Sequence, residues 1–224
     1  MFLKIVYQKD ANMIKRGLLS FAGAALLSAL LFACSDSGTS AKDSFDASVV
    51  CPAEGVNAYG EPNRGTFTDE RDGQVYKYTT IGNQVWMAEN LKFETPYRYN
   101  CASLSLCTYV LKENSTQTGK LDQNRLDTLC PAGWHIPSVD EWHLLVDNIG
   151  GAKHLKRLSP EFGTDDCKFN SIGWRWNAYT AHYWTSTQND EFWSYSVVIH
   201  KWEEDDYFVT GKNGKDMLVR CLKD

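Results

Sequence analysis

Alternating apolar and polar side chains predict strands early in the chain. In residues 73–90, "GQVYKYTTIGNQVWMAEN", Tyr76 and Tyr78 fall on one face of an extended segment and the intervening side chains on the other. Gly82 and Asn83 are typical of a turn, and "QVWMA" follows them. The pattern predicts a pair of adjacent strands.

A second pair of strands is predicted in "EFWSYSVVIHKW" and "DYFVTG", which are joined by the acidic run at residues 203–206. The closing "DMLVRCLKD" predicts a last strand that ends the domain. Residues 151–190 show little periodicity and are rich in Gly, Ser, Thr, Asn and aromatic residues. We expect this long irregular region to carry the binding surface.

The sequence "SVDEWHLLVDNIGG" predicts an amphipathic helix. Ser138 is a good N-cap, and Glu141 three residues later completes a capping box. Gly150 and Gly151 end the helix. Its apolar face is formed by side chains at helical spacing, namely Val139, Trp142, Leu145, Val146 and Ile149.

The stretch "CPAGWHIPSVDEWHLLV" gathers two histidines, two acids and a cysteine, which raises the question of a catalytic or metal cluster. His135 precedes the helix, so it cannot pair with His143 at the i,i+4 spacing of a helical zinc site. His143 and Asp147 fall on the flank that faces water, where such a pair contributes a few tenths of a kcal/mol. Because Glu141 already caps the helix, we interpret the stretch as framework.

The segment "MIKRGLLSFAGAALLSALLFAC" has the build of a bacterial export signal, with a short basic start followed by an apolar run. The uncharged run from Leu18 to Ala33 is shorter than the ~20 residues that span a bilayer. A membrane anchor helix is the alternative. Residues 1–33 are therefore predicted to be a signal peptide, with Met13 as its expected start.

Cys34 follows "LFA", an ending that resembles a lipobox and implies that Cys34 is acylated and becomes the mature N-terminus. An aspartate at the next position would indicate retention at the inner membrane, so Ser35 favours the outer membrane. Residues 34–50 are small and polar and are predicted to form a flexible tether. Residues 51–224 are then a single domain, anchored by lipid to the bacterial cell envelope.

Acidic side chains outnumber basic ones, with 28 Asp and Glu against 23 Lys and Arg, and the formal net charge is −5. Removal of residues 1–33 makes the charge more negative, because that segment carries four basic residues and one acidic residue. Such a surface repels phosphate backbones, which argues against a nucleic-acid partner.

Six cysteines follow Cys34. An even number in an exported chain indicates up to three disulfides, with fifteen connectivities available. Free or metal-bound thiols are the alternative, although the lack of a C-x-x-C pair weakens the case for zinc. The six are Cys51, Cys101, Cys107, Cys130, Cys167 and Cys221.

The order of several sequence blocks resembles a known family. "GTFTDERDGQVYKYTTIGNQVWMAENLKFE", "CPAGWHIPSVDEWHLLVDNIGG", "YWTSTQ" and "VRCLKD" are similar to the Fibrobacter succinogenes major paralogous domain (FISUMP), over residues 65–224. That family is similar in turn to the C-type-lectin-like and formylglycine-generating-enzyme superfold, which has "RLPTEAEWE"-like and "GFRC"-like segments. The resemblance implies an α+β fold with a C-type-lectin-like mixed sheet, one or two helices and long irregular loops, stapled by disulfides. It implies no agreed biochemical activity.

The resemblance also implies a cysteine pairing. The pairs are Cys101–Cys107, Cys130–Cys221 and, as the remaining pair, Cys51–Cys167. The chain departs from the family at "CTYVLKENSTQTGK", where relatives usually show a "YGRLYTW" segment. A helix there, or a ligand contact, is therefore not carried over to this chain.

Trp174 and Trp176 lie in the irregular region and would project to the same face of an extended segment. With Arg175, Asn177 and Tyr179 nearby, the two rings could form a platform for a sugar or for an apolar patch of a partner. The alternative is that both rings are buried, as we expect for most of the other tryptophans.

Two short motifs bear on calcium. "EPN" at residues 61–63 resembles the calcium-and-sugar triplet of C-type lectins but precedes the first strand, whereas "QNDE" at residues 188–191 is better placed. Calcium needs six to eight oxygen ligands, and acidic runs such as residues 203–206 are usually solvated. No metal or other cofactor is predicted, with calcium as the alternative.

The sequence contains no G-x-S-x-G, H-E-x-x-H or phosphate-loop motif. Cys167 and Cys221 do not form the close pair that a formylglycine-type oxidase needs. We therefore expect a non-catalytic surface lipoprotein that contacts membrane lipid through Cys34 and binds a polysaccharide or a surface protein through its lectin-like domain. The alternatives are an enzyme, either an oxidase relative or a carbohydrate hydrolase, and a structural envelope protein without a small ligand.

Overall fold

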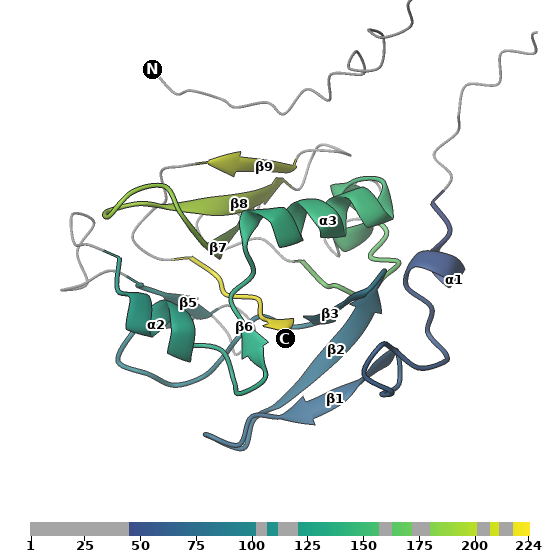
Figure 1. The fold of residues 1–224 in the computed structure, drawn as a ribbon, viewed down its shortest axis with the longest axis horizontal. Helices are drawn as coiled ribbons and strands as arrows, with labels where there is room; N and C mark the ends of the chain where they lie inside the picture. The colour runs from purple at the N-terminus through teal and green to yellow at the C-terminus, as the bar shows by residue number, and fades with distance from the viewer. Residues whose placement is uncertain are drawn as a thin grey trace, which may run out of the picture. The chain divides into compact units, whose positions relative to one another are not determined.

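The strand pair predicted in residues 73–90 lies within a five-stranded antiparallel sheet in the computed structural model (Figure 1). Its strands are β1 (Arg64–Thr68), β2 (Val75–Ile81), β3 (Gln84–Met87), β10 (Leu222–Lys223) and β6 (Trp134–His135), in that order across the sheet. Tyr76 and Tyr78 are buried whereas Val75 and Lys77 are exposed, which confirms the predicted alternation.

Residues 45–224 fall in one compact unit. The structure describes residues 45–101, 107–111, 121–156, 163–171, 180–200, 207–210 and 217–224. Within these ranges, no helix is long and apolar enough to cross a membrane. The predicted signal peptide and Cys34 lie outside them.

Two smaller antiparallel sheets accompany the large one. They contain β4 (Arg98–Cys101) with β5 (Cys107–Tyr109), and β7 (Thr180–Gln188) with β8 (Ser194–His200) and β9 (Tyr207–Thr210). The pairing of β8 with β9 confirms the second predicted pair. Strand β7 corrects the prediction that residues 151–190 are irregular. The strand does not show a regular apolar and polar alternation in the sequence, because one of its buried residues is a threonine. Thr185 is fully buried, and its hydroxyl donates to the carbonyl of Tyr195 at 2.7 Å.

The predicted amphipathic helix is α3 (Val139–Ile149). Its capping box is present, since the backbone N–H of Glu141 donates to the Ser138 hydroxyl and the Glu141 carboxylate accepts from the backbone N–H of Ser138. Gly150 ends the helix in a left-handed conformation, with φ of 68°. The helix lies beside β7 and β8 (Figure 1), and its fully buried side chains are Trp142, Leu145 and Ile149.

Among the described residues, packing extends upstream of Cys51 to Phe45. The Phe45 ring stacks on that of His154 with 3.7 Å between centroids, and α1 (Ala47–Val50) packs against the same core. Residues 45–50, the last part of the predicted tether, pack on the domain through the side chains of Phe45, Ala47 and Val50. Two other short helices that the sequence did not predict are α2 (Gln123–Thr128) and η2 (Ala152–Leu155).

The last strand is shorter than predicted because its segment contacts all three sheets. Met217 forms a bridge with β5, Leu218 forms a bridge with β7, and only β10 joins the large sheet. Every residue from 217 to 222 is at most 3 % exposed. The C-terminal segment is thus the buried seam along which the sheets meet.

The structure contains the disulfides Cys51–Cys167 and Cys130–Cys221, which are pairs that the resemblance implied. Cys101 and Cys107 are register partners of β4 and β5, and Cys107 is disulfide-bonded, while the side chain of Cys101 is not described. The first disulfide ties the start of the packed chain to a late loop, and the second ties the approach to β6 to the C-terminal seam. The domain is an α+β fold stapled by disulfides.

Candidate functional site

The platform residues proposed from sequence, Trp174, Arg175, Trp176, Asn177 and Tyr179, lie outside the described part of the chain, as do Cys34 and the acidic run at 203–206. They stay predictions. The described residues point to a different place for a site.

The two calcium motifs have local structural roles. Glu61 forms an ion pair with Lys223, and Asn63 is buried. The carboxylate of Asp190 accepts from the backbone N–H groups of residues 192 and 193, which forms a turn. In the described ranges, no group of three or more His, Cys, Asp and Glu side chains could hold a metal ion.

The histidine-rich stretch contains an ion-pair clamp that the sequence did not predict. Nδ1 of His135 lies 2.6 Å from an Asp224 carboxylate oxygen, and its Nε2 lies 3.1 Å from one of Glu141. The hydrogen bond with Glu141, and after it the one with Asp224, raise the pKa of His135 against the opposing effect of burial. Burial also opposes the shift of Glu141, but hydrogen bonds from His135 and Ser138 lower its pKa to about 2. The clamp joins the C-terminus to the start of α3.

A pocket of about 700 Å³ opens over β1 and β2, and we call it the β1–β2 pocket. Its size is within the usual range of small-molecule sites. Its walls are formed by β1, β2 and the segment after β3, together with residues 163–171. We call residues 163–171 the pocket loop. The lining residues are Arg64, Gly65, Thr66, Lys77, Tyr78, Ala88, Glu89, Asp165, Lys168 and Asn170.

Strand register determines which side chains face the pocket loop. Thr66 pairs with Lys77, and Arg64 with Thr79, so these four side chains share one face of the sheet. The Thr79 hydroxyl donates to the carbonyl of Cys167 at 2.7 Å in a buried hydrogen bond, which places the pocket loop on that same face. The charged side chains of β1 and β2 are therefore directed to the pocket side.

Gly65 and Tyr78 pair on the opposite face of the hairpin. A Cβ atom at Gly65 would lie 2.7 Å from the Tyr78 hydroxyl oxygen, so the ring lies across the glycine and a larger residue would displace it. Burial, together with the negative charge of Glu61, raises the pKa of Tyr78. The face of the hairpin that carries Thr66 and Lys77 is thus polar and charged, while Gly65 and Tyr78 add to the lining from the other face.

The pocket loop has a strained backbone. Asp165, Lys168 and Asn170 have φ values of 48°, 57° and 59°, and within the described ranges no other non-glycine residue has a positive φ. All three line the β1–β2 pocket. The left-handed conformation costs roughly 1–2 kcal/mol for a residue with a Cβ, and Asp and Asn tolerate it better than Lys. Because strain of this kind concentrates at functional sites, its coincidence with the pocket marks the candidate site.

Arg220 holds the pocket loop against the sheet. Its side chain is fully buried, and Nη1 donates to the carbonyl oxygens of Met87 and Phe169. Nε and Nη2 donate to the side-chain oxygen of Asn90, and Nη2 also lies 3.4 Å from the carbonyl of Asn170. Burial lowers the pKa of Arg220, but a guanidinium stays charged in proteins. One buried cation therefore joins the segment after β3 to the pocket loop.

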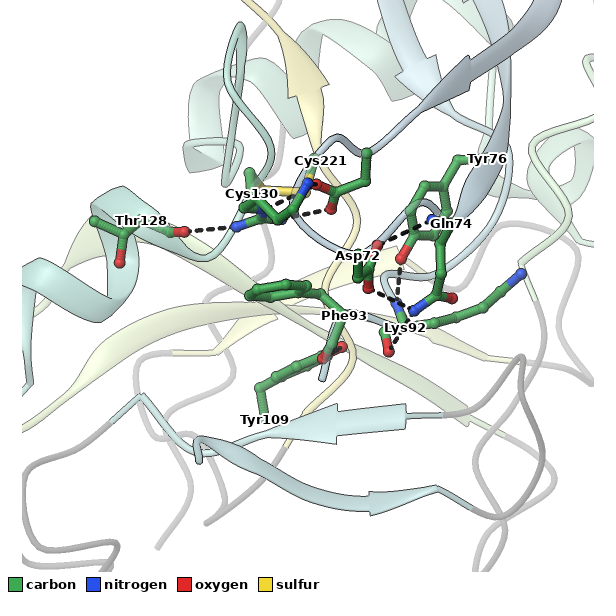
Figure 2. A network of polar contacts seen from close by, with 11 residues as sticks. Asp72, Gln74, Tyr76, Lys92, Phe93, Tyr109, Thr128, Cys130 and Cys221 are labelled. Atoms are coloured by element: carbon green, nitrogen blue, oxygen red, sulfur yellow. Dashed lines mark hydrogen bonds and ion pairs between the residues drawn. A yellow bond between two sulfur atoms is a disulfide. The ribbon is translucent and has the colours of Figure 1, made fainter. Parts of the chain in front are cut away.

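The segment after β3 is fixed by the network in Figure 2. The Tyr76 hydroxyl accepts from the backbone N–H of Lys92 at 3.0 Å, and the Gln74 amide donates to the Lys92 carbonyl at 3.3 Å and to Asp72 at 2.7 Å. Burial raises the pKa of Tyr76 to about 12, so its hydroxyl stays neutral. The network thereby fixes the chain next to Glu89, which lines the pocket.

The two acids of the pocket have internal partners. The carboxylate of Glu89 lies 3.4 Å from the ammonium of Lys92 and accepts from the backbone N–H of Lys77 at 2.9 Å. Asp165 is buried, and its carboxylate accepts from the backbone N–H of Asn170 at 2.6 Å. Both carboxylates serve the framework of the pocket.

Sequence reasoning did not find the β1–β2 pocket. One local signal was present in "DDCKFN", where Asp165 and Asn170 flank a half-cystine and both favour left-handed backbone. Nothing in the sequence indicated that this loop lies on the β1–β2 hairpin.

Comparison with curated proteins finds no significant match, and comparison with solved structures finds none either. Comparison with protein families finds a match that spans residues 79–159, which include the last three residues of β2 and all of α3. It is shorter than the resemblance read from sequence blocks, which runs from residue 65 to 224. The match supports the assignment of residues 79–159 to the Fibrobacter succinogenes major domain.

Proposed function

We propose that this chain is a non-catalytic lipoprotein of the bacterial cell envelope, acylated at Cys34 and held at the outer membrane, whose domain binds a polysaccharide in the β1–β2 pocket. The observation that carries the binding function is the coincidence of the pocket with three strained left-handed residues. Disulfides and the buried Arg220 hold the surrounding walls rigid, which lowers the entropy cost of binding.

The lipid anchor is supported by the sequence of residues 13–34. Each buried methylene of an acyl chain contributes ~0.8 kcal/mol, so several chains on one residue hold a protein firmly at a membrane. Labelled palmitate should be incorporated into the wild-type protein and not into Cys34→Ser. Equal labelling of both proteins, or labelling of neither, contradicts the anchor.

Binding without turnover is favoured by the state of the pocket acids. A glycosidase needs one carboxyl group as an acid and a second as a base or nucleophile, both placed beside the scissile bond. Glu89 is engaged by Lys92 and by a backbone N–H, and Asp165 is buried against Asn170. Release of reducing sugar from a panel of polysaccharides by the purified protein contradicts a non-catalytic role.

Two tryptophan substitutions on one strand test the site. Thr66 and Thr68 are both exposed on the same face of β1, but only Thr66 lines the pocket. Thr66→Trp should obstruct the part of the pocket next to β1 and lower pull-down by insoluble polysaccharides at least about tenfold, a loss that corresponds to ~1.4 kcal/mol. Thr68→Trp is the matched control and should bind as the wild type does.

The same pull-down separates the competing views. Loss of binding in Trp174→Ala/Trp176→Ala, with Thr66→Trp unaffected, would move the site to the predicted aromatic platform. Lack of binding to every polysaccharide by a folded wild-type protein would reject the proposal and leave a structural envelope protein.

A further inference from the structure

Three basic side chains line the β1–β2 pocket, each from a different element. Arg64 comes from β1, Lys77 from β2 and Lys168 from the pocket loop. In the part of the chain that the structure describes, none of them forms an ion pair with an acidic side chain. Lys77 and Lys168 are exposed to solvent. The positive charge of Lys168 acts on the carboxylate of Asp166, whose hydrogen bonds go to Thr164 and His154, so the three cationic groups of the pocket have no direct ion-pair partner among the described residues.

Arg64 is positioned without being neutralised. Its Nη2 donates to the backbone carbonyl of Cys51 at 2.8 Å and to that of Asp166 at 3.3 Å. Its Nε has no hydrogen-bond partner among the described residues. Because carbonyl groups hold the guanidinium in place, its positive charge remains to attract an anion.

The two acidic side chains that line the pocket already form hydrogen bonds or ion pairs within the protein. Glu89 has Lys92 and a backbone N–H as partners, and Asp165 has the backbone N–H of Asn170. These two carboxylates still disfavour a densely charged ligand such as a polyphosphate. Single negative charges spaced along a polymer match three separated cations better. Arginine and lysine both form charge-assisted hydrogen bonds with carboxylates.

We infer that the β1–β2 pocket takes a carboxylated polysaccharide, built from uronic acid residues, and that Arg64, Lys77 and Lys168 contact its carboxylates. This inference rests on the proposed function and adds the charge class of the ligand to it. It also explains a cationic pocket in a chain whose formal net charge is −5.

The test compares oligogalacturonate with its fully methyl-esterified form, which has the same sugar backbone without charge. Calorimetric titration of the purified full-length protein in detergent should give at least about tenfold weaker binding for the ester. Binding of the acid should weaken further as NaCl rises from about 0.02 M to about 0.2 M, because salt screens exposed charges. Binding of the ester should change little with salt.

Charge-removing variants locate the contact. Lys77→Gln should weaken binding of the acid about tenfold, as the loss of one charge-assisted contact predicts. Arg98→Gln is the matched control, because it removes one positive charge from β4, outside the pocket, and should leave binding within about twofold. Equal losses in the two variants would mean that only the overall charge matters and would overturn the inference.

Lys168→Gly separates binding from stability. Glycine adopts the φ of 57° without strain, so this variant should unfold at a denaturant concentration no lower than that of the wild type. Its affinity for the acid should nevertheless fall about tenfold. A purely structural role for Lys168 predicts unchanged affinity, which would count against the inference.

The outcomes distinguish this inference from the function on which it rests. Tighter binding of the acid than of the ester, with this preference lost in Lys77→Gln and Lys168→Gly, supports both the charge class of the ligand and the binding function. Equal binding of acid and ester, or binding only of neutral polysaccharides, overturns the charge class and keeps the binding function. Lack of binding to any polysaccharide overturns both.

Discussion

Replacement of Arg220 by methionine tests whether one buried cation holds the pocket together. Methionine fills much of the volume of the arginine side chain but donates no hydrogen bond. Arg220 is fully buried and donates to acceptors on Met87, Asn90 and Phe169, which are themselves at most 2 % exposed. In the variant these three acceptors stay buried without this donor.

The expected loss follows from the hydrogen bonds that the variant removes from these buried acceptors. A buried acceptor that loses its partner costs ~1–3 kcal/mol, so three of them cost several kcal/mol, and loss of the cation–π contact with Phe169 at 4.4 Å adds to this. The variant also removes the buried positive charge of Arg220 and with it the free-energy cost of desolvating that charge, which offsets part of the loss. We therefore expect the free energy of unfolding to fall by about 4 kcal/mol, a large share of the ~5–15 kcal/mol typical of a domain.

Guanidinium chloride unfolding of the non-reduced protein, followed by tryptophan fluorescence, measures this loss. Arg220→Lys should fall between the wild type and Arg220→Met, because one ammonium group satisfies only part of the set. Arg98→Met is the control: Arg98 is partly buried, pairs with the exposed Glu94 and donates to the Lys92 carbonyl at 3.3 Å, so the loss should stay near about 1 kcal/mol. A loss of less than about 1 kcal/mol in Arg220→Met would refute the view that this residue organises the pocket.

Other substitutions test the framework around the pocket. Ser138→Ala removes the N-cap of α3 and should lower the free energy of unfolding by about 1 kcal/mol in chemical denaturation, and an unchanged value would contradict the cap. Cys51→Ala/Cys167→Ala opens a link between residues 116 apart and should cost about 4 kcal/mol of unfolded-state entropy, visible as a lower Tm in calorimetry. The partners of His135, with Glu141 first, raise its pKa, so its imidazolium stabilises the native state fully below about pH 6.5 and less as pH rises through the raised pKa. The stability difference between wild type and His135→Gln should therefore shrink from about pH 6 to about pH 8 and stay within about 1 kcal/mol, since the side chain is partly exposed. A difference that grows with pH would show that the clamp does not hold a charged imidazole.

The sequence alone determined those helices and strands that depend only on residues close together in the chain. The capping box from Ser138 to Glu141, the apolar spacing along α3 and the left-handed Gly150 all lie within one helix, so helical geometry alone fixes them. The alternation around Tyr76 and Tyr78 likewise fixed β2. Strand β7 was missed because buried hydroxyl residues such as Thr185 blur the period on which such a prediction depends.

The tertiary structure alone decided where the candidate site lies. The Thr79 hydroxyl and the Cys167 carbonyl are 88 residues apart in the chain and 2.7 Å apart in space, and this contact places the pocket loop over the hairpin. Arg220, 130 residues from Asn90, fixes the opposite wall. Periodicity and capping report only on contacts within a few residues, whereas a pocket depends on which distant segments share one face of the sheet. The sequence thus determined the strand pair and the helix, and the packing of distant segments determined the pocket and the position of its charges.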